Sequence, residues 1–199
     1  MTDVVEALGD ALPLVRSDPG WIGVALADLD AIHADHLHCE RKAAQSALSL
    51  IRSYPEKTDL VTQMARLAHD ETRHVVQVAA LMTRREQPAA YDFGDDYAVS
   101  LRDHIRKQEP LRLLDRLLVF AVIEGRSAER LQLLADHLED SKSRDLYASL
   151  ATAEVRHRDI FLALARDIDP ASWRARAKEL AELEAQVFVD RPLTARIHG

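Results

Sequence analysis

The chain has 199 residues, of which 47% are hydrophobic and 30% charged, and its formal net charge is −7. This composition excludes a disordered or collagen-like chain, and the length suits one domain with its own hydrophobic core. The single cysteine, Cys39, excludes an internal disulfide, a zinc finger and a rubredoxin-like iron centre. With only 6 glycines and 7 prolines, the sequence favours an all-α fold over a turn-rich β fold.

The predicted elements are helices that end at prolines or at clusters of polar residues. In chain order they are a short amphipathic helix within 1–19, long helices over Trp21–Ser53 and Glu56–Arg85, a short one near Tyr97–Lys107, long helices over Pro110–His137 and Lys142–Ile168, and a peripheral helix within 171–190. Four long helices with a long crossover between the second and the third are typical of a ferritin-like four-helix bundle. We expect a single domain over 1–199, with the bundle core at about 21–168. An irregular α-helical domain is the alternative.

The two halves of the predicted bundle resemble each other in sequence. When the chain is shifted by 83 residues, the segment 65–74 falls on 148–157, and Ala, Leu, Ala, Glu, Arg and His coincide. A shift of 84 residues places Glu40 on Glu124. This pattern indicates an internal repeat of a helix pair, although two alanine-rich helices can also resemble each other by chance.

Each long helix places one carboxylate in the middle of its apolar stripe, and two helices add a histidine three residues later. These six residues are Glu40, Glu71, His74, Glu124, Glu154 and His157. Burying four carboxylates at one level is costly unless cations neutralise them. One Glu from each of two helices plus Glu-x-x-His from the other two is the pattern of a two-metal carboxylate site. Side chains three apart on a helix share a face, so a Glu and its His can reach one ion.

The ligand chemistry of these six residues favours iron, with manganese as the alternative, because the set is rich in carboxylates and lacks thiolates. In the competing interpretation they are partly exposed or mutually hydrogen-bonded polar groups of the bundle. Three neighbouring residues are candidate partners of the metal ligands. His36 lies one turn before Glu40, and Arg73 and Arg156 flank the two histidines. A satisfied core histidine and solvated arginines are the alternatives.

The segments that carry these residues resemble one family, the tRNA 2-methylthio-N6-isopentenyladenosine hydroxylases (the MiaE family). They are His36–Ala44, Ala68–His74, Ile123–Arg130 and Glu154–His157, and the similarity spans roughly residues 20–168. Gly125 departs from this pattern, because a small residue other than glycine is expected at its position.

The resemblance implies an enzyme, an O₂-dependent di-iron monooxygenase that hydroxylates the isopentenyl side chain of a modified adenosine next to the tRNA anticodon. The six residues would bind two iron ions, O₂ would be a co-substrate, and electrons would come from an external donor. The tRNA anticodon stem-loop would be the substrate, and the protein would be cytoplasmic. The acidic start of the chain fits this location, because it lacks the basic region of a secretory signal. Its longest uncharged stretches are also far shorter than the ~20 apolar residues of a membrane span.

A net negative charge is unusual for a protein that binds RNA, so we expect a local basic surface. The candidate RNA-binding residues are Arg84, Arg85, Arg102, Arg106 and Lys107, and Arg112 and Arg116 follow them in the chain. Tyr91, Phe93 and Tyr97 in the crossover are candidates for stacking on a base.

Other functions remain open at this point. One is a different ferritin-like di-iron or di-manganese oxidase or oxygenase, for example one that acts on lipids or aldehydes, or an iron-handling protein. Another is a non-catalytic helical binding protein. The sequence leaves the oligomeric state open.

Overall fold

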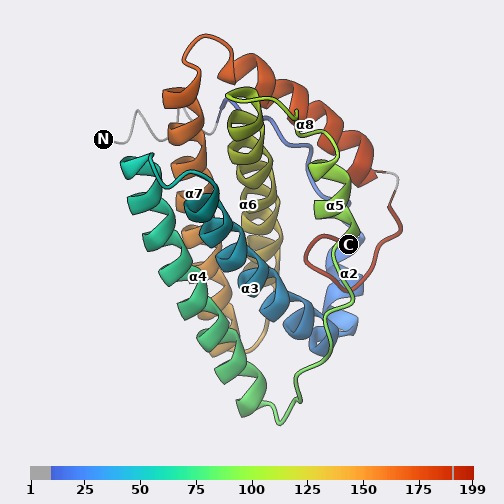
Figure 1. Cartoon of the computed structure of the whole chain (residues 1–199). Helices are drawn as coiled ribbons and strands as arrows, with labels where there is room; N and C mark the ends of the chain where they lie inside the picture. The colour runs from blue at the N-terminus through green and yellow to red at the C-terminus, as the bar shows by residue number, and fades with distance from the viewer. Residues whose placement is uncertain (1–9, 190) are drawn as a thin grey trace.

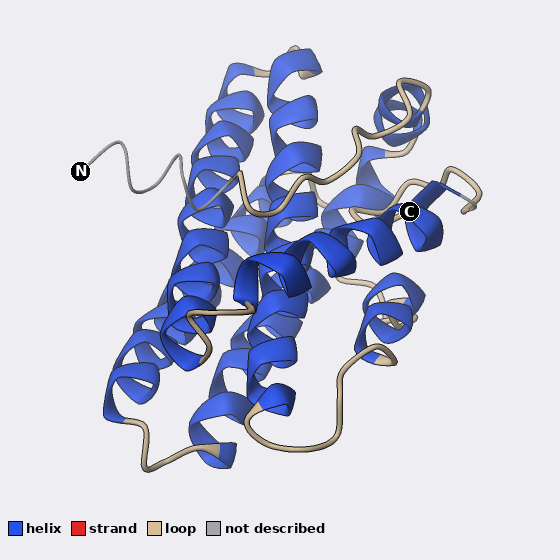
Figure 2. Ribbon diagram, turned by 90° about the horizontal axis from the view of Figure 1, so that it is seen from above, coloured by secondary structure: helices blue, strands red, loops and turns tan. Residues whose placement is uncertain are grey.

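The computed structural model describes residues 10–189 and 191–199, and within these residues it contains helices and loops but no strand (Figures 1 and 2). The helices are α2 (Trp21–Ala27), α3 (Leu29–Ser53), α4 (Thr58–Arg84), α5 (Asp96–Arg102), α6 (Leu111–His137), α7 (Ser141–Ile168) and α8 (Trp173–Val189). The expected all-α fold is confirmed. None of the described helices has the length and hydrophobicity to cross a lipid bilayer.

The four long helices form two closely packed pairs. Helix α3 lies along α4, α6 lies along α7, and the pairs meet where α4 touches α7 (Figure 1). Helices α5 and α8 pack against each other and against α6 on one side of this bundle. Among the described residues, α3 and α6 make no close backbone contact. The bundle is therefore a four-helix bundle with the predicted crossover between its second and third helices, and it is open between α3 and α6.

Three details differ from the predicted helix boundaries. The helix predicted over Trp21–Ser53 breaks at Asp28, whose carboxylate accepts a hydrogen bond from the Ala31 amide at 3.0 Å and caps α3. An aspartate side chain competes for backbone donors in this way and ends regular helical structure. The crossover helix ends at Arg102 rather than Lys107. Residues 12–18 of the predicted N-terminal helix are not helical, whereas 1–9 and 190 lie outside the described residues.

The hydrophobic core consists of two clusters with a polar layer between them. Along α4, Met64 and Leu67 belong to one cluster and Val78 to the other. Along α7, Leu150 belongs to the second cluster and Phe161 to the first. In both helices the residues between the clusters are the predicted Glu-x-x-His motif. Apolar packing on both sides thus fixes these motifs at one level of the bundle.

A buried ion pair attaches α8 to the bundle. The Arg126 guanidinium on α6 donates to Glu184 Oε1 on α8 at 2.8–2.9 Å, and both side chains are fully buried. The Tyr97 hydroxyl donates to the same oxygen at 3.0 Å, and the guanidinium lies 3.7 Å from the centre of the Phe188 ring. These contacts pair the two buried charges through Glu184 Oε1, whereas Glu184 Oε2 has no hydrogen-bond partner among the described residues.

Replacing Arg126 by leucine is expected to lower the free energy of unfolding by about 3–5 kcal/mol, because it leaves the Glu184 carboxylate buried without its partner. Urea unfolding followed by circular dichroism measures this change. As a control, Lys178→Leu removes a cation that is 69% exposed on α8 and is expected to change stability by about 0.5 kcal/mol or less. Equal effects of the two substitutions would contradict this account of the ion pair.

Candidate metal centre

The structure brings together all six residues that the sequence singles out. Glu40 comes from α3, Glu71 and His74 from α4, Glu124 from α6, and Glu154 and His157 from α7. Each side chain is buried, with at most 5% of its surface exposed. We call these residues the six-residue cluster.

The distances within the six-residue cluster are those of side chains that share one centre. The His74 Nδ1 atom lies 3.2 Å from Glu71 Oε2, 3.3 Å from Glu40 Oε2 and 3.6 Å from Glu154 Oε1. The His157 Nδ1 atom lies 2.7 Å from Glu71 Oε1 and 3.7 Å from Glu154 Oε2. The two Glu-x-x-His motifs contribute four residues, and each of these offers one ligand atom within 4.8 Å of the other three.

Two carboxyl groups of the cluster hold their protons unusually tightly. Burial, with the charge of Glu154 beside it, raises the pKa of Glu71 to about 8. Burial and the charge of Glu154 also raise the pKa of Glu124 well above its ordinary value. Glu124 and Glu154 share a hydrogen bond. Like charges at this depth cannot all remain ionised, so protons are held where cations are lacking.

His74, His157 and Glu40 are shifted toward their charged forms. Burial acts to lower the pKa of His74 and of His157, but the carboxylates close to each ring prevail and raise both to about 10. For Glu40, burial acts to raise the pKa, yet the charge and hydrogen bond of His36 hold it below its ordinary value. The cluster therefore has a strong electrostatic demand for positive charge, which metal ions meet more fully than protons do.

Several buried atoms of the cluster have no hydrogen-bond partner among the described residues. They are Glu71 Oε1, Glu154 Oε1 and both ring nitrogens of His157. The short contact between His157 Nδ1 and Glu71 Oε1 is not aligned as a hydrogen bond. Buried polar atoms are rarely left unpaired, and four carboxylates with two imidazoles are a donor set suited to iron or manganese. The residues present thus fit a two-metal site.

The three predicted partners of the ligands take different places. His36 is buried, and its Nε2 atom lies 2.6 Å from Glu40 Oε1. Arg73 is exposed and connects to the cluster only through Asp70, whose two oxygens lie 3.2 Å from Arg73 Nη2 and 3.9 Å from His157 Nε2. The sequence reasoning missed Asp70.

Arg156 does not take the predicted place, because its side chain is exposed. Neighbours in a helix are about 100° apart, and on α7 this rotation places Arg156 outside the buried face that carries His157.

A cavity of about 420 Å³ opens beside the cluster, in the gap between α3 and α6. We call it the central cavity. Glu40, Glu124 and Glu154 form part of its wall, and residues 94–102 cover it. Its apolar lining includes Ala43, Phe120, Ile123 and Phe161, and its polar lining includes Asp95, Ser127 and His198. The volume is typical of a site for a small organic group.

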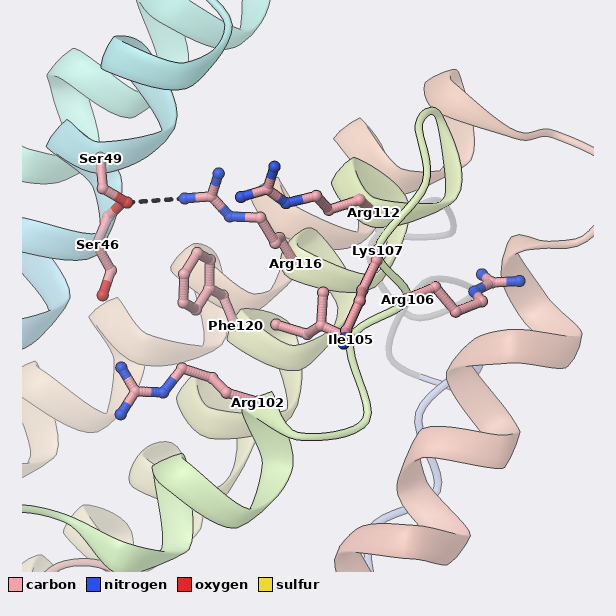
Figure 3. Close-up of a pocket in the computed structure, with 9 residues that line it drawn as sticks. All are labelled: Ser46, Ser49, Arg102, Ile105, Arg106, Lys107, Arg112, Arg116 and Phe120. Carbon is pink, nitrogen blue, oxygen red and sulfur yellow. Dashed lines mark hydrogen bonds between the residues drawn. The ribbon is translucent and has the colours of Figure 1, made fainter.

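A second cavity, of about 570 Å³, adjoins the central cavity and is strongly basic (Figure 3). We call it the basic pocket; its charged lining consists of Arg102, Arg106, Lys107, Arg112 and Arg116. Both cavities share Ser46, Ser49, Arg102 and Phe120. The Arg116 guanidinium donates to Ser49 Oγ at 2.8 Å, which directs it across the pocket (Figure 3).

The predicted basic residues differ in whether they line this pocket and in whether an acidic residue already pairs with them. Arg106 points away from the other arginines (Figure 3), and its guanidinium binds the buried Asp115 carboxylate at 2.7 Å. Its charge is therefore largely neutralised. Arg84 and Arg85 lie at the end of α4 and do not line the pocket, and Arg85 lies 3.6 Å from Asp30.

The three aromatic candidates also divide. Tyr97 is fully buried and bonded to Glu184, so it is excluded as a surface for stacking a base. The side chains of Tyr91 and Phe93 are 89% and 84% exposed. Only these two are accessible to a partner.

Comparison with known proteins adds independent information. Residues 11–199 match the family model described as tRNA-(MS(2)IO(6)A)-hydroxylase (MiaE). Two relatives are named tRNA 2-(methylsulfanyl)-N(6)-isopentenyladenosine(37) hydroxylase. The one from Pseudomonas putida is 40% identical over 172 residues, covering 86% of this chain and 83% of the relative. The one from Salmonella typhimurium is 30% identical over 219 aligned positions, covering 86% and 81%.

A solved structure is also similar over nearly the whole chain. It is the Synechococcus protein described as protein 43 with aldehyde deformylating oxygenase activity. It is 34% identical to this chain, has a TM-score of 0.87, and the match covers 94% of this chain and 95% of that one. The helical arrangement described above is thus shared with an oxygenase.

Proposed function

This chain belongs to the MiaE family, and we propose on that basis that it is an oxidoreductase that hydroxylates the isopentenyl side chain of 2-methylthio-N6-isopentenyladenosine in tRNA. The observation that carries the proposal is the position of the six-residue cluster. It forms part of the wall of a cavity that adjoins a basic pocket. This arrangement offers one place for metal ions, one for an apolar side chain and one for a phosphate backbone.

The six-residue cluster would hold two iron ions, and its two Glu-x-x-His motifs bring four ligand atoms within 4.8 Å of one another. When bound, such an iron pair supplies the O₂-dependent chemistry by which a C–H bond is hydroxylated. The electrons for this reaction would come from an external donor. His36 orients Glu40 through the 2.6 Å contact, and Asp70 places a carboxylate 3.9 Å from His157 Nε2, on the side of the ring away from Glu71.

The central cavity would receive the isopentenyl group. Its side chains near the cluster include Ala43, Phe120, Ile123 and Phe161, which favour a branched hydrocarbon over water. Excluding water strengthens the electrostatic interactions within the site and limits side reactions. These residues would place the reacting C–H bond close to Glu40 and Glu124.

The basic pocket would bind phosphates of the anticodon loop. The substitutions Lys107→Glu and Arg112→Glu, made together, are expected to weaken binding of a tRNA anticodon stem-loop by at least about tenfold and to flatten its salt dependence. Filter binding at several salt concentrations measures both effects. Iron content is expected to be unchanged, because neither residue belongs to the cluster.

The matched control is the double substitution Arg84→Glu and Arg85→Glu, which changes the charge equally outside the pocket. We expect it to have a much smaller effect on RNA affinity. If both pairs weakened binding equally, or if the first pair had no effect, RNA binding would not be centred on the basic pocket.

A second candidate function follows from the Synechococcus structure, whose protein has aldehyde deformylating oxygenase activity. The apolar residues of the central cavity are compatible with a hydrocarbon chain. A basic pocket next to the cavity favours a polyanionic substrate over an uncharged aldehyde.

Nucleoside mass spectrometry separates these functions. We expect tRNA from cells that overproduce the protein to contain the prenylated adenosine with one additional oxygen atom, and tRNA from cells that lack it to contain only the unhydroxylated form. Unchanged tRNA together with turnover of long-chain aldehydes would overturn the tRNA function in favour of the second candidate.

The proposal also includes a single domain over the whole chain and a cytoplasmic location, where tRNA is modified.

A further inference from the structure

Three polar residues from distant parts of the chain form a hydrogen-bonded chain in the wall of the central cavity. His198 Nδ1 lies 2.9 Å from Asp95 Oδ2, and His198 Nε2 lies 3.0 Å from Ser127 Oγ. Asp95 is the cap of α5, and Ser127 lies on α6 about one turn after Glu124. All three residues line the cavity. This series of hydrogen bonds thus ends at the Ser127 hydroxyl, close to the six-residue cluster.

The position of His198 is fixed by contacts of the segment that carries it. The His198 ring stacks on Tyr97 with a distance of 4.9 Å between ring centres. Asp35 on α3 accepts hydrogen bonds from the Ile197 amide at 2.8 Å and from Arg196 Nε at 2.9 Å. The segment 196–199 therefore connects α3 with α6 across the side on which the bundle is open. His198 is consequently only 6% exposed.

The hydrogen bonds from Asp95 to His198 and from His198 to Ser127 also determine whether the Ser127 hydroxyl donates or accepts. Asp95 caps α5 through Oδ1, which accepts a hydrogen bond from the Ala98 amide at 3.0 Å, and its Oδ2 atom is the acceptor toward His198. Nδ1 of the imidazole must then carry the hydrogen, and in the neutral ring Nε2 is an acceptor. The Ser127 hydroxyl then donates to Nε2, and its oxygen can still accept a hydrogen bond. Because Ser127 lines the central cavity, this part of the wall suits a ligand that carries a donor.

We propose that Ser127 Oγ accepts a hydrogen bond from the N6–H group of the modified adenine, and that His198 and Asp95 are positioning residues that fix Ser127 as the acceptor. This inference rests on the proposed function and identifies how the base is oriented. The N6–H group is the donor that directly joins the purine to the isopentenyl chain. A hydrogen bond one helical turn from Glu124 would direct that chain toward the six-residue cluster.

The test uses synthetic anticodon stem-loop RNAs that carry either 2-methylthio-N6-isopentenyladenosine or the same nucleoside with a methyl group in place of the N6 hydrogen. We expect the iron-loaded wild-type protein to bind the first RNA about tenfold more tightly in a competition assay. Ser127→Ala and His198→Ala are expected to lose most of this preference, because the first removes the accepting hydroxyl and the second removes the partner that fixes its orientation. Ser46→Ala, a control that alters another serine of the cavity wall, is expected to retain it.

The outcomes are distinguishable from failure of the proposed function. A wild-type protein that binds both RNAs equally, or a Ser127→Ala variant that keeps the tenfold preference, would overturn the inference while leaving hydroxylation of tRNA intact. In the second case the added methyl group would be excluded by its size alone. Failure of the wild-type protein to bind either RNA would overturn the proposed function and this inference together.

Cys39 provides a readout that is independent of RNA and of activity. Its sulfur atom, Asp95 and His198 offer ligand atoms within 4.8 Å of one another, and it is the only cysteine of the chain. His198→Ala is expected to speed the reaction of Cys39 with a thiol reagent severalfold by opening the wall, whereas Ser46→Ala is not. An unchanged rate in His198→Ala would show that His198 does not close this part of the cavity.

Discussion

Replacing Glu71 by alanine is expected to abolish hydroxylation of tRNA, to below about one-thousandth of the wild-type rate, and to leave less than about one iron ion bound per chain. The reason is the central place of this carboxylate. Its oxygens lie 3.2 Å from His74 Nδ1 and 2.7 Å from His157 Nδ1, so it contacts the histidines of both Glu-x-x-His motifs. Single-turnover assays with metal analysis of the same sample measure both quantities.

The same loss is expected for His157→Ala, which removes an imidazole from the opposite helix pair. The control is Glu182→Ala, which removes a carboxylate that is 65% exposed on α8 and is expected to change neither iron content nor rate. Wild-type activity in either cluster variant would show that the ligand assignment is wrong.

The second large effect is expected from the metal itself. Loading the metal-free protein with ferrous iron under anaerobic conditions is expected to stabilise it by about 3–4 kcal/mol at 100–1,000 times the dissociation constant. For a chain of this size that corresponds to an increase in melting temperature of about 5–15 °C. The increase is expected because four buried carboxyl groups lose their mutual repulsion when cations bind among them.

Differential scanning calorimetry of the metal-free and loaded forms measures this shift. Glu71→Ala is expected to show little or no increase on addition of iron, although it still folds. If neither iron nor manganese raised the melting temperature of the wild-type protein, the cluster would be a hydrogen-bonded polar layer rather than a metal-binding site.

The fold and the six-residue cluster could be predicted from the sequence because both depend on a local pattern. Apolar residues that recur with the helical period define which face is buried, and a carboxylate on that face has no good alternative to a cation. Met64, Glu71 and Val78 illustrate the pattern, since they share one buried stripe of α4.

The rest of the site could not be predicted because it depends on tertiary contacts that no local pattern encodes. Asp95, Ser127 and His198 meet although up to 103 residues separate them. The break at Asp28 depends on one side-chain cap that competes with an otherwise continuous helix. Arg106 counts as a phosphate-binding candidate in the sequence, and only the structure shows that Asp115 binds it.

The net charge of the chain illustrates how a global quantity hides a local one. A charge of −7 argues against a general nucleic-acid binder, yet five cationic side chains line one pocket. Electrostatic attraction between exposed charges falls off over about 8–10 Å at physiological salt, so the local arrangement governs what binds there.

Six inward-facing side chains that form a site for a pair of iron ions have a defined capacity for metal. We expect anaerobic titration of the metal-free protein with ferrous iron, followed by metal analysis after removal of the unbound ions, to give about two iron ions per wild-type chain. Binding of less than about one ion per chain, or the same iron content in wild-type protein and in Glu71→Ala, would contradict it.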